Sequence, residues 1–147
     1  MNSTKKRKLI IDRSKWLNNF STDYECTYSE LLNEDGNMCC LGFAGAQLCG
    51  AKRRELLGKS IPEEVAKVYK RGLSFLLNFY SSTESYNSNI ANELIHLNDD
   101  HIPNTPSSRL RREKKITEIF AKQDIVVKFV GRYPEYVYEN QKKDKVK

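Results

Sequence analysis

Residues 35–43 read Asp-Gly-Asn-Met-Cys-Cys-Leu-Gly-Phe. The Asp-Gly pair is a strong turn signal, and the residues after it repeat at the spacing of one helix face. The members of that face are Met38, Leu41, Gly45 and Leu48. We therefore expect a buried helix over residues 38–49, with small residues that let another element approach closely. The turn could equally close a hairpin between a strand near residues 27–32 and a strand that starts at Met38.

Two stretches elsewhere in the chain have the pattern of strands. Residues 8–11 form a short β-like run, and Ile-Val-Val-Lys-Phe-Val at residues 125–130 is the clearest strand pattern. Helical patterns occupy residues 89–97 and a stretch from Ser107 or Ser108 to about residue 123. The 147 residues suit one domain. We expect a helix-rich α+β fold with a small sheet, formed by the N-terminal strand, the strand near 125–130 and a possible central hairpin.

The composition indicates a polar globular protein. Hydrophobic residues make up 39% of the chain and charged residues 30%, which is polar for this size. No apolar run approaches the roughly 20 residues that span a bilayer. Residues 9–11 are too few for the apolar region of a signal peptide. We therefore expect a cytoplasmic protein with no membrane partner.

The formal net charge of +6 favours acidic partners, such as nucleic acid, nucleotides or an acidic protein face. Much of the excess positive charge lies near the two ends of the chain. Residues 1–7 and 139–147 are therefore expected to be flexible basic tails, and the net charge is only weak support for a binding site.

The cysteine and histidine residues raise the question of metal or nucleophile chemistry. Their positions are Cys26, Cys39, Cys40, Cys49, His96 and His101. No two cysteines have the two-residue spacing of structural zinc sites, so we expect no metal and reduced thiols that pack as small buried hydrophobes. A nucleophilic Cys39 or Cys40 with His96 as its base is the open alternative.

A basic helix and an Asn-Asp-Asp run supply the candidate ligand-binding residues. These candidates are Arg109, Arg111, Arg112, Lys115, Asn98 and Asp99. Arginines in the N-terminal half of a helix suit a phosphate, although a solvated charged face has the same pattern. Asn98 and Asp99 could accept hydrogen bonds from a ribose or base, hold the backbone of the following helix, or simply end a helix. With Asp100, the carboxylate pair could also bind Mg²⁺.

Aromatic residues alternate with polar ones near the C-terminus, at Tyr133, Tyr136 and Tyr138. Next to cations, such rings could stack on bases, or they could pack a C-terminal arm onto the domain. The chain shows no signature of a helix-turn-helix, zinc finger or RNA-recognition domain. It also contains no phosphate-binding glycine loop.

The order of these motifs resembles a group of small proteins of bacteriophages and prophages. The resemblance rests on Met-Cys-Cys-Leu-Gly-Phe at residues 38–43, Leu-Ile-His-Leu-Asn-Asp-Asp at residues 94–100, and the basic helix and strand that follow. It covers residues 31–130 by the order of motifs. It implies a phage origin and a host-cytoplasm setting, and it carries over no activity, cofactor or binding residue.

The leading hypothesis is a non-catalytic accessory protein for host takeover or counter-defence. It would inhibit a host defence protein by contact or bind that system's nucleotide signal. The alternative is a nucleic-acid-binding module that uses the basic helix over residues 109–122. The second alternative is a small enzyme that depends on a cysteine or on Asp99 and Asp100. No cofactor is implied, and a homo-oligomer is possible.

Overall fold

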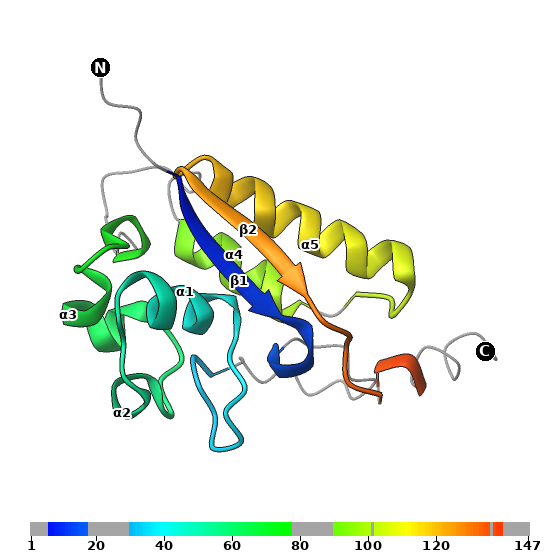
Figure 1. Ribbon diagram of the computed structural model, residues 1–147, viewed down its shortest axis with the longest axis horizontal. Coiled ribbons are helices and arrows are strands. Elements are labelled where there is room, and N and C mark those ends of the chain that lie inside the picture. Colours follow the sequence, from blue (N-terminus) through cyan, green and yellow to red (C-terminus); the bar gives the residue numbers. More distant parts are fainter. Residues whose placement is uncertain (1–5, 18–29, 78–89, 101, 136, 140–147) are drawn as a thin grey trace.

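The computed structural model describes residues 6–17, 30–77, 90–100, 102–135 and 137–139. The strands β1 (Arg7–Asp12) and β2 (Ile125–Val130) form a two-stranded parallel sheet. Both predicted strands are confirmed. Because they lie near opposite ends of the sequence, the sheet joins the two ends of the domain, as Figure 1 shows.

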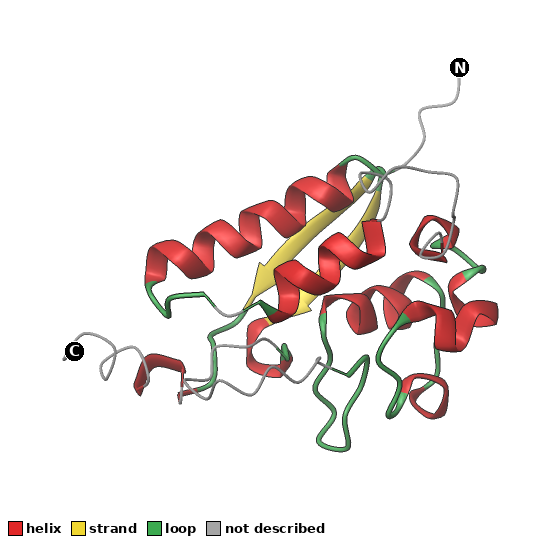
Figure 2. Cartoon of the chain, turned by 180° about the vertical axis from the view of Figure 1, so that it is seen from behind, coloured by secondary structure: helices red, strands yellow, loops and turns green. Residues whose placement is uncertain are grey.

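The helices are grouped in two places around this sheet. Helices α4 (Ile90–Asp99) and α5 (Pro106–Ala121) lie side by side across one face of the sheet (Figures 1 and 2). Helix α1 (Cys40–Leu48) packs against β1 and α4. The short elements are α2 (Arg53–Leu56), α3 (Ala66–Tyr69), and the 3-10 turns η1 (Arg13–Lys15), η2 (Pro62–Val65) and η3 (Ser74–Leu77). The predicted helix-rich α+β class is confirmed.

The sheet buries one face and exposes the other. Leu9 and Ile125 are fully buried towards the helices, whereas Ile10 and Val126 are 45% and 43% exposed on the outer face. The amide of Gln47 also closes part of the outer edge of β1. Its Oε1 accepts from Ile10 N at 2.8 Å, and its Nε2 donates to Ile10 O at 2.7 Å. These two bonds attach β1 to an exposed side chain of α1.

The predicted turn before α1 is present and leads into the helix. Gly36 has φ +85°, and Asn33 Oδ1 accepts from the backbone N–H groups of Asp35 and Asn37 at 3.0 and 2.9 Å. The hairpin alternative does not form a ladder in the described residues, because Leu32 bridges to Leu57 and Met38 bridges to Trp16. The first part of that hairpin, residues 27–29, lies outside the described residues.

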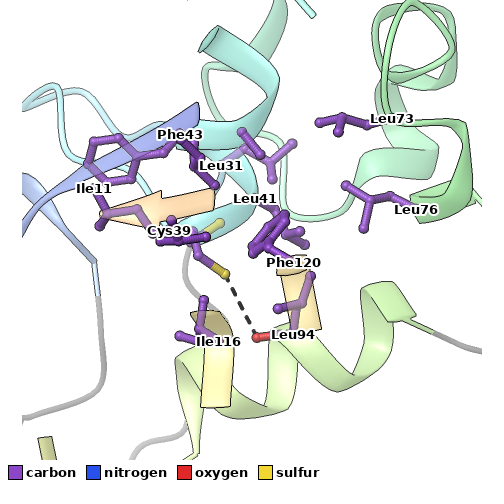
Figure 3. Packing of buried hydrophobic residues seen from close by; sticks show 14 of the residues in the cluster. Ile11, Leu31, Cys39, Leu41, Phe43, Leu73, Leu76, Leu94, Ile116 and Phe120 are labelled. Carbon is purple, nitrogen blue, oxygen red and sulfur yellow. Dashed lines mark hydrogen bonds between the residues drawn. The ribbon is translucent and has the colours of Figure 1, made fainter. Parts of the chain in front are cut away.

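The small residues of α1 do allow close contact, as the sequence predicts. A Cβ on Gly42 would lie 1.8 Å from Leu31 O, and one on Gly45 would lie 2.7 Å from the hydroxyl of Tyr69. That buried hydroxyl donates to Leu41 O at 2.7 Å. Figure 3 shows Leu31, Leu41, Leu94 and other core side chains gathered around this helix.

The predicted tails are described only in part. Residues 1–5 and 140–147 lie outside the described residues. Arg7 is the first residue of β1, where its guanidinium donates to Gly72 O at 2.7 Å. Among the residues that the structure describes, no helix is long and apolar enough to span a membrane.

Substituting Gly42 with alanine should destabilise the fold by about 3 kcal/mol, since the added methyl group collides with the Leu31 carbonyl of a packed segment. Urea unfolding followed by circular dichroism measures this free energy. Gly50→Ala is the matched control. Gly50 has φ +64° but open space around it, so only backbone strain of about 1 kcal/mol is expected. Equal losses for both variants would contradict the close contact at Gly42.

Candidate functional site

Asn98, on the last turn of α4, forms the centre of a buried polar network. Its side chain is 1% exposed. Its Oδ1 accepts from Trp16 Nε1 at 2.6 Å and from Cys40 N at 3.0 Å, and its Nδ2 donates to Leu17 O and Asp99 Oδ1, both at 2.8 Å. These four bonds use the two donors and two acceptor positions of an amide. The side chain of Asn98 therefore acts inside the fold rather than towards a ligand.

The bond to Cys40 N has a further structural role. The first amides of a helix have no intrahelical partner, and the N-cap residue Cys39 provides no side-chain bond to α1. Asn98 therefore caps α1 from a different helix. The sequence predicts that the Asn-Asp pair holds the backbone of the following helix, whereas the helix that the Asn98 side chain caps is α1, which precedes it in the chain.

Arg112 fixes the end of α4. Its guanidinium donates to Asn98 O at 3.2 Å and to Asp100 O, so two carbonyls at the C-terminus of α4 bind a cation, which suits the negative end of the helix dipole. Burial lowers the pKa of Arg112 to about 10, and the nearby Tyr133 and Asp100 act in the opposite direction. This arginine is 3% exposed and joins α4 to α5.

A groove runs between α4 and α5, which we call the α4–α5 groove. Its first hollow has a volume of about 220 Å³, and its charged lining includes Asp100, Arg111, Arg112 and Lys115. Its apolar wall includes Leu97, Ile102 and Pro103. A second hollow of about 390 Å³ shares His96, Leu97, Asp100 and Lys115 with the first, and continues along the helices to Lys122. The groove is thus continuous over about three turns of α5.

The groove brings together three of the six candidate residues. Arg111 and Lys115 are exposed and one turn apart, and Arg112 forms part of the floor beside them. Asp99 is 8% exposed and accepts from the Asn98 amide. Arg109 lies on the other side of α5, where it donates to Asn104 Oδ1 at 2.6 Å.

Sequence reasoning missed a second buried polar cluster beside Arg109. Glu113 accepts two bonds from Arg13, at 2.9 and 2.7 Å, and a third from the Tyr133 hydroxyl. Burial, followed by this bond to Glu113, raises the pKa of Tyr133. The bond to Glu113 is also the main cause of the raised pKa of Arg13. The only signal in the sequence was the four-residue spacing of Arg109 and Glu113 on a charged helix.

The C-terminal aromatic residues that the structure describes pack onto the domain. Tyr133 is 7% exposed, and its ring centroid lies 6.1 Å from that of Trp16 and 6.5 Å from that of Tyr138. This packing agrees with the predicted C-terminal arm. Tyr136 lies outside the described residues.

The described cysteines are buried structural groups. Cys40 Sγ donates to Leu94 O at 3.9 Å, the dashed line in Figure 3, and Cys49 Sγ donates to Tyr69 O at 3.8 Å. Burial raises the pKa of Cys39 to about 12 and is the largest cause of the raised pKa of Cys40 and Cys49. These thiols are poor nucleophiles at neutral pH.

Metal ligands do not gather in the described part of the chain. No group of three or more His, Cys, Asp or Glu residues there could hold a metal ion. His96 lies at the exposed groove, with Nδ1 3.4 Å from Asp100 Oδ1. Cys26 and His101 lie outside the described residues.

No family model, curated protein or solved structure matches this chain. The resemblance to phage proteins therefore stays a prediction from the order of motifs.

Replacing Asn98 with alanine should lower the free energy of unfolding by about 3 kcal/mol, because it leaves Trp16 Nε1 and Cys40 N buried without this acceptor. The measurement is urea unfolding. Glu93→Ala, an exposed change on the same helix, should stay within about 0.5 kcal/mol of the parent. If Asn98→Ala unfolds at the same urea concentration as the parent, the hydrogen bonds of this amide do not stabilise the fold.

Cys39 and Cys40 should react with iodoacetamide at least about a hundredfold more slowly in the folded protein than in urea, because they are buried and their thiolate form is disfavoured. Site-resolved mass spectrometry of labelled peptides gives the rate for each thiol. Fast labelling of one of these two cysteines in the native protein would contradict this prediction and support the alternative of a cysteine-dependent enzyme.

Proposed function

We propose that this protein is a non-catalytic accessory protein of the phage type, which acts in the host cytoplasm by binding. Its ligand is a nucleotide signal of a host defence system, held in the α4–α5 groove. The single observation that carries the proposal is the pairing of cations and an apolar wall in one groove. Arg111 and Lys115 face the same hollow as Leu97 and Ile102.

The charges differ along the groove. In the first hollow Arg111, Arg112 and Lys115 outweigh Asp100. In the second hollow, by contrast, Glu93, Asp100 and Glu118 outnumber the lysines Lys115 and Lys122. A phosphate group is therefore stabilised best in the first hollow, where the exposed cations Arg111 and Lys115 lie one turn apart.

The apolar wall suits the remainder of a nucleotide. Small-molecule sites combine apolar surface with a few polar groups that set orientation. In the first hollow, Leu97, Ile102 and Pro103 provide the apolar surface, and Ser108 provides a hydroxyl. A base can lie against this wall while its phosphate contacts Arg111 and Lys115.

The other polar groups near the groove have structural roles and do not require a catalytic step. Arg112 donates to the Asn98 carbonyl at the end of α4, and the Asn98 side chain accepts from the first amide of α1. The buried thiols are weak nucleophiles. Inhibition of a host defence protein by direct contact remains the other form of the same proposal. It requires no small ligand in the groove.

Replacing both Arg111 and Lys115 with alanine should weaken binding of ATP, GTP and cyclic dinucleotides by about a hundredfold, since two charge-assisted contacts to phosphate are lost. Isothermal titration calorimetry over such a panel measures the affinity. The matched control is Lys114→Ala/Lys128→Ala, which removes the same charge from two exposed positions that do not line the groove.

The two double variants separate a site from a general charge effect. Equal weakening in both would show non-specific attraction to a basic protein. If the parent binds no nucleotide of the panel, the nucleotide form of the proposal fails and contact with a host protein is left.

A further inference from the structure

A separate hollow of about 230 Å³ lies on the other side of α5 from the groove. Its lining includes Arg13, Arg109, Leu110, Arg132, Tyr133 and Tyr138. Positions two apart on a helix are rotated by roughly 200°. Arg109 and Arg111 therefore point to opposite flanks of α5, and the two hollows do not share a lining residue.

Arginine and tyrosine side chains alternate along this hollow in what we call the arginine–tyrosine ladder, in the order Arg13, Tyr133, Arg109, Tyr138 and Arg132. The Cζ atoms of Arg13 and Arg109 lie 5.9 and 5.6 Å from the centroid of the Tyr133 ring. The Cζ atoms of Arg109 and Arg132 lie 5.5 and 5.2 Å from the centroid of Tyr138. Each distance is within the range of a cation–π contact.

The lining carries an excess of positive charge. Among the described residues that line it are three arginines and the carboxylate of Glu113. Glu113 accepts two hydrogen bonds from Arg13, so this carboxylate offsets the charge of the first arginine of the ladder.

Arg109, the central arginine of the ladder, is held in place before any ligand arrives. Arg109 is 6% exposed and donates to Asn104 Oδ1, and Asn104 Nδ2 donates in turn to Val137 O at 2.7 Å. Cations that are already ordered lose less conformational entropy on binding. The planar guanidinium fork also matches the geometry of a phosphate oxygen pair.

We propose that the arginine–tyrosine ladder is a phosphate-binding site, distinct from the α4–α5 groove. Arg132, the exposed outer member, contacts a phosphate directly, and Arg109 adds its charge from behind. The phosphate belongs either to a single-stranded nucleic acid or to a free phosphate ion, since both present the same oxygens. Tyr138 positions the two arginines and does not need to stack on a base.

The test is fluorescence anisotropy with the full chain and a fluorescein-labelled oligothymidylate of about ten nucleotides, with inorganic phosphate as competitor. Arg132→Ala should weaken binding by about tenfold, because one charge-assisted contact is lost. Arg132→Lys, which keeps the charge and loses the fork, should lie between that variant and the parent. Lys128→Ala removes an exposed cation from the outer face of β2 as the matched control and should bind as the parent does.

The competitor identifies the source of the phosphate. Displacement of the oligonucleotide by millimolar inorganic phosphate assigns the site to a free phosphate ion. The absence of displacement assigns it to a nucleic-acid strand. Either result supports the site when Arg132→Ala also loses affinity for the oligonucleotide. Arg111→Ala/Lys115→Ala should keep its affinity for the oligonucleotide, so failure of the groove and failure of the ladder are distinguishable.

Three results would overturn the proposal. The first is an equal effect of Arg132→Ala and Lys128→Ala. The second is loss of oligonucleotide binding in Arg111→Ala/Lys115→Ala alone. The third is binding of labelled polyglutamate with no binding of the oligonucleotide or phosphate, which would identify the hollow as a contact for an acidic protein.

Discussion

The buried amide of Asn98 is the interaction on which the arrangement of this domain depends. It joins the indole of Trp16 in the N-terminal segment to the first amide of α1, and it sits on the last turn of α4. In a low-dielectric interior such bonds are strong, and leaving one partner alone is costly. The amide therefore fixes where α1 begins and where α4 ends. Arg112, bound to the carbonyls at that end, sets the place of α5.

Helix α5 contributes both to the interior of the domain and to two surface sites, the α4–α5 groove and the arginine–tyrosine ladder. Its buried arginines Arg109 and Arg112 tie the helix to the loop before it and to α4. Its exposed cations Arg111 and Lys115 face the groove. The buried and the exposed cations come from one basic stretch of sequence, because neighbouring residues of a helix point to different sides. A charged helix of this type can be part of the core and a binding surface together.

The sequence predicts the regular elements better than the contacts between them. Strand β2 and helix α5 follow from local periodicity, and the buried character of α1 follows from its small residues. The sequence predicts that this helix starts at Ser107 or Ser108, but α5 begins at Pro106 and its N-cap is Thr105, whose hydroxyl accepts from Ser108 N. Three of the four side-chain partners of Asn98, on Trp16, Leu17 and Cys40, lie 58 to 82 residues away in the chain, so no local pattern reveals them. Burial of Arg112 was equally hidden, since an arginine on a basic helix is ordinarily solvated.

We propose that the protein acts by holding a nucleotide rather than by catalysing a reaction. Native mass spectrometry of the protein purified from bacteria tests this most directly, because a captured ligand travels with the folded chain. We expect an added mass equal to one nucleotide or cyclic dinucleotide, which is lost when the protein unfolds. A ligand-free mass that stays unchanged when nucleotides are supplied would contradict it.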